Sequence, residues 1–133
     1  MTIDADALTQ WFDRYLDTFA ACARGDRDIT ALLDYYAVPL IITTDAGVVA
    51  ITTHEQAAAV LQGQVGGLQG AAYHHSEVLA AEASVLNTTS GLYRATLSRL
   101  DRHGGEIDCV TVSYVVTDGP HGPQISVLAA HAA

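Results

Sequence analysis

Apolar residues recur every three or four positions over the first part of the chain, between Leu8 and Cys22. This spacing predicts a helix with one apolar stripe, made of Leu8, Trp11, Phe12, Tyr15, Leu16, Phe19 and Cys22. Asp4 or Asp6 can cap its first turn, and Gly25 can end it. The first element is therefore expected to be a long amphipathic helix.

A second, shorter helix is predicted from Asp28 onward, and it ends ahead of Pro39 because the residue before a proline resists helical geometry. Its inward side chains would be Ile29, Leu32, Leu33 and Tyr36. Two segments rich in β-branched residues follow, 38–44 and 48–52, with turn-forming residues 45–47 between them. This pattern predicts a hairpin.

Thr53 and Gln56 match a capping box and predict the start of a third helix. Glycines at positions 63, 66, 67 and 70 disfavour its last turns, so we expect that end to fray. The remainder alternates as strands do, over residues 71–86, 92–101, 107–117 and 124–131, with turn segments between them. The expected order is helix, helix, two strands, helix and four strands, in one α+β domain spanning residues 1–133.

The charge balance narrows the choice of partners. The chain of 133 residues has a formal net charge of −9, from fifteen acidic residues against six arginines and no lysine. A nucleic acid or an anionic membrane is disfavoured as a partner, because phosphate binding needs a basic patch. Half of the residues are hydrophobic, which favours an oligomer that hides apolar surface between subunits.

Cofactor and metal motifs are absent from the sequence. Cys22 and Cys109 have no metal-type spacing and are expected to be free thiols. The glycine-rich residues 63–70 follow a helix instead of opening one after a strand, so they do not predict a phosphate-binding loop. The N-terminal residues lack a basic region followed by an apolar run, so we expect a cytoplasmic protein with no metal or cofactor and no membrane span.

The last two predicted strands carry a resemblance to a known superfamily. Residues 114–131 read YVVTDGPHGPQISVLAAH, and together with the order of elements this stretch resembles the nuclear transport factor 2-like (NTF2-like) superfamily. That superfamily includes SnoaL-like polyketide cyclases, ketosteroid isomerase and scytalone dehydratase. The resemblance implies a cystatin-like cone, in which a strongly curved, mainly antiparallel sheet wraps the N-terminal helices and leaves a pocket at its open end. It also implies homodimers formed through the outer face of the sheet.

Two departures from the superfamily pattern concern the site. Pro123 stands where a tryptophan often begins the final strand, and residues 42–44 contain no carboxylate where isomerase-like members place their general base. The missing carboxylate argues against a proton transfer of the isomerase type.

His75 is one candidate for acid–base chemistry. His74 and His75 are adjacent on a predicted strand, so their side chains should point to opposite faces and cannot share one metal ion. Strict alternation turns His75 toward the pocket beside Tyr73 and Glu77, and Glu77 could orient its imidazole. A β-bulge between them would reverse this assignment.

Asp108 is the other candidate, because it shares a strand face with Val110, Val112 and Tyr114. A carboxyl group in apolar surroundings holds its proton more tightly, as a general acid requires. Its position beside a turn equally allows exposure to solvent. Arg94 is the arginine predicted to pair with it across adjacent strands.

The sequence favours binding of a small hydrophobic or amphipathic molecule, without a complete catalytic set. The expected pocket residues are Trp11, Tyr15, Tyr36, Tyr73, Glu77, Tyr114 and His131. The alternative is a cofactor-free isomerase, cyclase or dehydratase of the SnoaL-like type, in which His75, steered by Glu77 or Asp108, moves a proton. A purely structural domain that presents its sheet to a partner protein is a third possibility.

Overall fold

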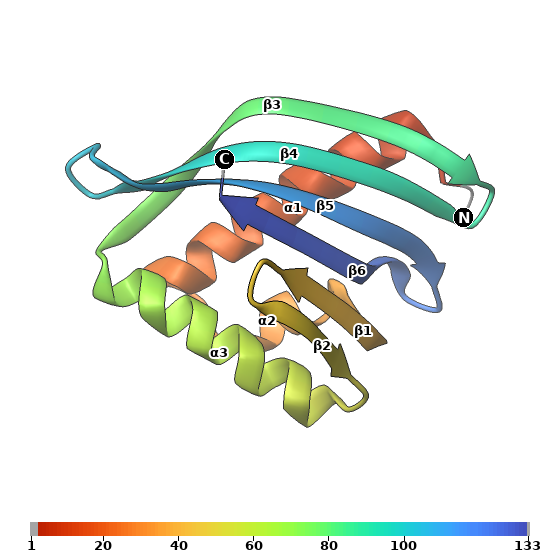
Figure 1. Cartoon of the computed structure of the whole chain (residues 1–133), viewed down its shortest axis with the longest axis horizontal. Coiled ribbons are helices and arrows are strands. Elements are labelled where there is room, and N and C mark those ends of the chain that lie inside the picture. Colours follow the sequence, from red (N-terminus) through yellow and green to blue (C-terminus); the bar gives the residue numbers. More distant parts are fainter. Residues whose placement is uncertain (1–2, 133) are drawn as a thin grey trace.

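The computed structural model describes residues 3–132, which form three helices and six strands in the predicted order (Figure 1). The elements are α1 (Ala5–Arg24), α2 (Thr30–Leu33), β1 (Tyr36–Thr44), β2 (Gly47–Ile51), α3 (His54–Gly70), β3 (Tyr73–Asn87), β4 (Ser90–Asp101), β5 (Glu106–Gly119) and β6 (Gly122–Ala132).

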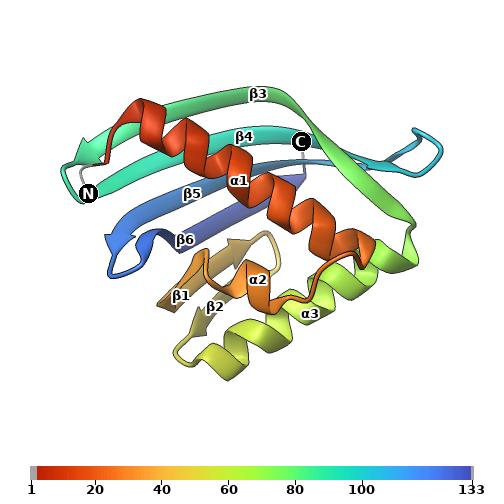
Figure 2. The same ribbon diagram turned by 180° about the vertical axis from the view of Figure 1, so that it is seen from behind.

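All six strands belong to one curved sheet with the order β2-β1-β6-β5-β4-β3. The last four strands pair antiparallel with their neighbours in sequence, whereas β1 pairs parallel with β6, with Ile42 opposite Leu128. Helix α1 crosses one face of the sheet and leaves the other face uncovered (Figures 1 and 2). The predicted α+β cone with a mainly antiparallel sheet is therefore confirmed.

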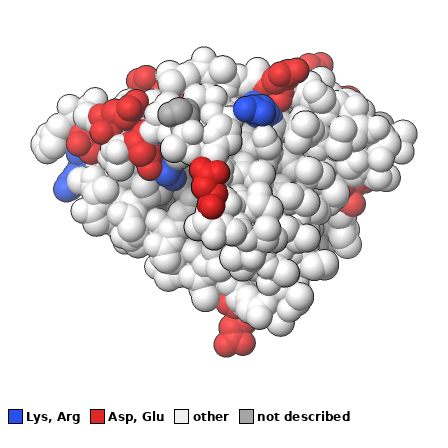
Figure 3. Space-filling view, viewed as in Figure 1, with Lys and Arg blue, Asp and Glu red and all other residues white. Residues whose placement is uncertain are grey.

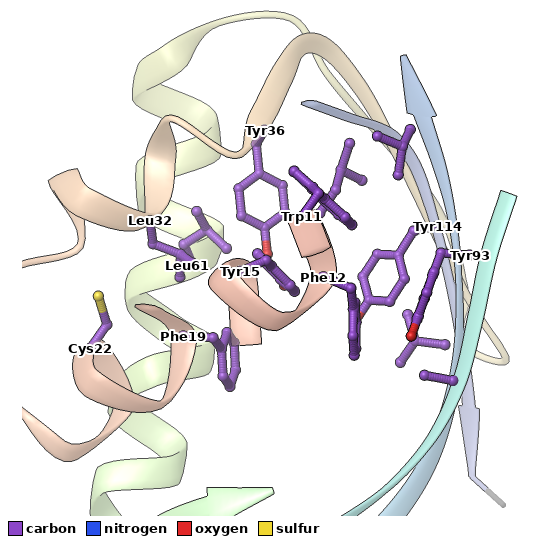
Figure 4. Close-up of a cluster of buried hydrophobic side chains, with 14 of the residues drawn as sticks. Trp11, Phe12, Tyr15, Phe19, Cys22, Leu32, Tyr36, Leu61, Tyr93 and Tyr114 are labelled. Atoms are coloured by element: carbon purple, nitrogen blue, oxygen red, sulfur yellow. The ribbon is translucent and has the colours of Figure 1, made fainter. Parts of the chain in front are cut away.

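Helix α1 provides the centre of the core. The Asp4 carboxylate accepts a hydrogen bond from the Ala7 N–H at 2.7 Å, and Gly25 ends the helix in the left-handed region at φ 84°. Six residues of the predicted stripe are buried, namely Leu8, Trp11, Phe12, Tyr15, Phe19 and Cys22. Their rings pack against tyrosines of the sheet; Phe12 stacks on Tyr93 with centroids 4.4 Å apart (Figure 4).

The second helix is much shorter than predicted, because the residues that follow it pair with strand β6. Helix α2 ends at Leu33, and Tyr36 opens strand β1 instead of continuing a helix. The Tyr35 carbonyl accepts a hydrogen bond from the Ile125 N–H at 2.8 Å, and Tyr36 pairs with Ile125. Sheet pairing thus overrides the local helical pattern, although Tyr36 still points inward.

Helix α3 begins at the predicted capping box, in which the Thr53 hydroxyl accepts from the Gln56 N–H and the Gln56 side chain accepts from the Thr53 N–H. Its four glycines do not shorten it, since the helix continues through Gly70 and still buries Leu68. The buried side of α3 packs against α1 and closes one flank of the core (Figure 2). Within residues 3–132, no helix has the length and apolar character needed to cross a membrane.

Candidate functional site

A cavity of about 90 Å³ lies between α1 and the curved sheet. Its walls come from both helical and strand elements, and the lining residues are Tyr15, Leu16, Phe19, Gln64, Ser76, Leu97, Arg99, Val110, Val112, Tyr114, Leu128 and Ala130. This volume is below the roughly 300 Å³ at which pockets for drug-sized ligands begin. Without rearrangement of side chains, the cavity therefore admits only a small molecule.

Two buried tyrosines, Tyr15 and Tyr114, line the cavity, and Tyr36 lies beside them. The Tyr15 and Tyr36 hydroxyl oxygens lie 2.5 Å apart, and the Tyr114 ring packs edge-on against that of Tyr15 with centroids 5.6 Å apart. Burial is the main cause that raises the pKa of all three phenols above the ordinary value. These groups are therefore neutral hydrogen-bonding hydroxyls, and Figure 4 shows them within the aromatic cluster around α1.

The outer end of the cavity carries charge. Arg99 donates from Nε and Nη2 to the two carboxylate oxygens of Asp108, each at 2.6 Å, and the two residues are direct cross-strand partners. Ser76 pairs with Arg99 on the other side, so three polar residues form a row across β3, β4 and β5. The Arg99 side chain is 17% exposed and that of Asp108 is 40% exposed, which places this row at the mouth of the cavity.

The prediction that Arg94 pairs with Asp108 is wrong. Strand register places Arg94 opposite Ser113 and Glu82, five residues away along β4 from the arginine that binds Asp108. Asp108 is therefore not an isolated acid on an apolar face, because both of its oxygens are held by Arg99.

The two adjacent histidines do not alternate as predicted. A register shift between Tyr73 and His75 breaks the period of β3, and Ser76, not His75, lines the cavity. The imidazole rings meet instead of diverging, with their Nδ1 atoms 2.8 Å apart. His75 Nε2 lies 3.9 Å from Glu77 Oε1, and both side chains are well exposed, at 43% and 60%.

The remaining expected pocket residues lie in several places. Tyr15 and Tyr114 line the cavity, whereas Trp11 and Tyr36 are buried beside it without lining it. Tyr73 reaches its edge, since the Tyr73 hydroxyl is hydrogen-bonded to Ser76 Oγ at 2.9 Å. His131 is exposed near the end of β6.

Sequence reasoning missed Gln64, Ser76 and Arg99. Arg99 lies on the same face of β4 as Leu97 and opposite Asp108, so a correct strand register would have identified it. Ser76 becomes a lining residue only because of the irregularity in β3. Across the described residues, no three His, Cys, Asp or Glu side chains gather in a way that could hold a metal ion.

Comparisons with solved structures agree with the observed fold. A cystatin-like protein of unknown function from Nostoc punctiforme PCC 73102 superposes with a TM-score of 0.72 at 10% identity, covering 100% of this chain and 96% of that chain. The yeast UBP3-associated protein Bre5 gives a TM-score of 0.72 at 12% identity, with coverages of 96% and 95%. A ketosteroid isomerase-like protein from Erwinia carotovora atroseptica SCRI1043 gives 0.66 at 11% identity, with coverages of 96% and 95%. At these identities the likeness concerns the fold alone.

No curated protein matches the chain significantly in sequence. A family model does match, over residues 5–133, and its family is described as NTF2-like protein (DUF6841). The match covers almost the whole chain and agrees with the curved sheet around α1. The chain belongs to this family of NTF2-like proteins.

Proposed function

We propose that this domain binds a small amphipathic molecule in the cavity between α1 and the sheet. The observation that supports this proposal is the change in polarity along the cavity. Its walls are apolar at Leu97, Val110 and Val112, and its mouth carries the charged row. An apolar body fits the walls, and an acidic or carbonyl oxygen fits the mouth. Pockets with a few polar groups that fix orientation are typical of small-molecule sites.

Arg99 has donors left for such a ligand. A guanidinium carries five N–H donors, and Asp108 engages two of them. The pair with Asp108 also fixes the plane of the guanidinium, so less conformational entropy is lost when a ligand binds. The hydroxyl of Ser76, next to Arg99 across the strands, can donate a further hydrogen bond to the same oxygen.

Binding is favoured over the isomerase, cyclase or dehydratase alternative by the positions of the candidate acid–base groups. His75 is well exposed and does not line the cavity, and Asp108 is paired with Arg99. The ketosteroid isomerase-like relative is similar in fold alone.

The uncovered face of the sheet supports a homodimer as part of this proposal. Figure 3 shows that much of the side of the molecule facing away from α1 carries no charged residue; the charged residues lie mostly along the upper part of this view, with one acidic residue near the middle of the face. Two large apolar side chains of β3 are exposed at the irregularities of that strand, namely Leu79 and Leu86. Light scattering behind gel filtration should give twice the mass of 14.0 kDa, and Leu79→Glu should return the monomer.

A thermal-shift screen tests ligand binding. Benzoate and benzyl alcohol are matched small probes, and fatty acids, aromatic polyketides and steroids extend the range of sizes. A ligand at 100 times its Kd should stabilise the fold by about 2.7 kcal/mol. Arg99→Gln should weaken the response to benzoate more than the response to benzyl alcohol.

A cavity-filling variant supplies the control. Ala130 lines the cavity, while Ala129 is its strand neighbour on the opposite face. Ala130→Leu should abolish the ligand-induced shift and Ala129→Leu should keep it. If no probe raises the melting temperature of the wild-type protein, or if both variants bind equally well, the proposal is wrong.

A further inference from the structure

A second hollow, of about 270 Å³, lies on the surface beside the cavity. It forms where the ends of α1 and α3 meet the start of β3 and the turn between β4 and β5. Arg24, His74 and Arg102 line it together with Asp26 and Tyr73. Two of only six arginines in a chain of net charge −9 thus gather at one concave site.

The backbone around this hollow is held in an unusual conformation. Ala72 has φ 60°, in the left-handed region that residues other than glycine rarely adopt. Its carbonyl accepts a hydrogen bond from the Arg102 N–H at 3.1 Å, and the carbonyl of His74 accepts one from Arg24 Nη1 at 2.8 Å. Strained backbone of this kind persists where surrounding contacts hold it, and it is enriched at ligand sites.

The histidine pair and Glu77 form a chain of polar groups that leads to the hollow. Glu77 Oε1 lies 3.9 Å from His75 Nε2, beyond hydrogen-bond distance but close enough for the negative charge of the carboxylate to favour a proton on that nitrogen. His75 Nδ1 is then the acceptor for the proton on His74 Nδ1, 2.8 Å away. This arrangement leaves Nε2 of His74 as the nitrogen that can take up a further proton.

We propose that the hollow binds a small oxyanion, such as a phosphate or carboxylate group, and that His74 takes up a proton when the anion binds. Arg102 supplies fixed positive charge and protonated His74 adds a second, while Arg24, which is paired with Asp26, holds the His74 carbonyl in place. His75 and Glu77 are positioning residues, because they hold the His74 ring in a tautomer that receives the proton at Nε2. The inference does not depend on a ligand in the inner cavity.

Other charged and titratable groups near His74 are consistent with this role. Asp26 is paired with Arg24 at 3.0 Å, and the Asp101 carboxylate accepts hydrogen bonds from the turn N–H groups of His103 and Gly105. Burial raises the pKa of Tyr73, so its phenol is neutral and adds no competing negative charge. Arg102 and His74 are therefore the groups that are available to bind an anion.

Sulfate is the probe for the test, because its charge does not change between pH 6 and pH 8. Titration followed by ¹H–¹⁵N correlation spectra should move the amide signals of residues 72–75 and 102. Binding should be tighter at pH 6 than at pH 8, since histidine is the side chain that changes charge in this range. His74→Gln and Arg102→Ala should each weaken binding at pH 6 by about tenfold, as expected for loss of one charge-assisted contact.

Glu77→Gln distinguishes a positioning role from a purely structural one. It should reduce the difference in sulfate affinity between pH 6 and pH 8 while leaving the melting temperature unchanged. His121→Gln, in the turn between β5 and β6, is the matched control and should bind sulfate as the wild type does.

Two results would overturn the inference. One is a set of sulfate-induced amide shifts spread over the whole surface, and the other is an equal sulfate affinity for His74→Gln and the wild type. Binding of the uncharged benzyl alcohol in each variant separates this test from the test of the cavity. Loss of sulfate binding with benzyl alcohol binding retained assigns the effect to the hollow.

Discussion

Arg99 and Asp108 face each other on neighbouring strands and are joined by two hydrogen bonds of 2.6 Å, one to each carboxylate oxygen. This bidentate pair is the only charged contact among the described residues that involves a side chain lining the inner cavity. It therefore provides a direct test of both the strand register and the electrostatics of the cavity mouth.

A double-mutant cycle between Arg99→Gln and Asp108→Asn should give a coupling energy of about 0.2–1 kcal/mol, the range typical of solvent-exposed ion pairs. The corresponding cycle between Arg94→Gln and Asp108→Asn should give none, because Arg94 lies opposite Ser113. Urea denaturation of the four proteins in each cycle measures both values. A larger coupling with Arg94 than with Arg99 would mean that the register of β4 and β5 is different.

Stability should fall steeply in alkaline solution. The pKa of Tyr15, Tyr36 and Tyr114 is raised in the folded state, mainly by burial. Below pH 10 both states keep these protons, so the stabilisation is fully present. Above pH 10 the unfolded chain releases protons that the folded chain retains, and each group then lowers the free energy of unfolding by about 1.4 kcal/mol per pH unit.

Urea denaturation between pH 8 and pH 11.5 measures this slope. Tyr36→Phe should reduce the slope of unfolding free energy against pH above pH 10 by about 1.4 kcal/mol per pH unit, the contribution of one proton. At neutral pH the same variant should destabilise the fold by about 1–3 kcal/mol, because it removes a hydrogen-bonding partner of the buried Tyr15 hydroxyl. A free energy of unfolding that stays constant up to pH 11.5 would contradict the burial of these phenols.

Gly91 should not tolerate even a methyl group. A Cβ at this position of β4 would lie 2.5 Å from Leu8 Cδ1 and 3.1 Å from Ile3 Cγ2, both on fully buried side chains. Gly91→Ala should destabilise the fold by about 1–3 kcal/mol through overpacking. Thermal denaturation provides the measurement.

Gly66 is the matched comparison, since it lies on the exposed side of α3 and a Cβ there would meet nothing within 4 Å. Gly66→Ala should stabilise the protein by about 0.4–1 kcal/mol, because alanine loses less backbone entropy in a helix. Opposite signs are expected for the two substitutions. Equal effects would mean that α1 and β4 are farther apart than observed.

The capping box of α3 provides a local test. Thr53→Ala removes the hydroxyl that accepts from the Gln56 N–H at 3.1 Å and should cost about 1 kcal/mol. Thr53→Ser keeps the hydroxyl and should restore most of the loss in a urea titration. If serine is as destabilising as alanine, packing of the threonine methyl group and not the cap is responsible.

The elements of the fold could be predicted from sequence because local patterns and tertiary contacts agree along most of the chain. The stripe from Leu8 to Cys22 predicts α1 and its buried face, and the capping box at Thr53 marks the start of α3. Tyr36 is the exception, since its pairing with Ile125 in β6 outweighs the local helical pattern. That partner lies far away in the sequence, where local periodicity carries no information about it.

The candidate site was less predictable because it depends on strand irregularities. The register of β4 and β5 shifts between Arg99 and Leu100, so counting back from the turn does not identify the partner of Asp108. A second shift near His75 places Ser76 at the cavity and brings the two imidazoles together. One inserted residue reverses every later assignment to a face, and alternation alone does not reveal it.

The parallel pairing of β1 with β6 has a consequence for biosynthesis. A ribosome releases the hairpin of β1 and β2 long before the strand that will lie beside it. Until then the inner edge of this hairpin has backbone amides and carbonyls without strand partners, a condition that invites association between nascent chains. Completion of the sheet must therefore be a late, long-range step, and folding should be slow for a domain of this size.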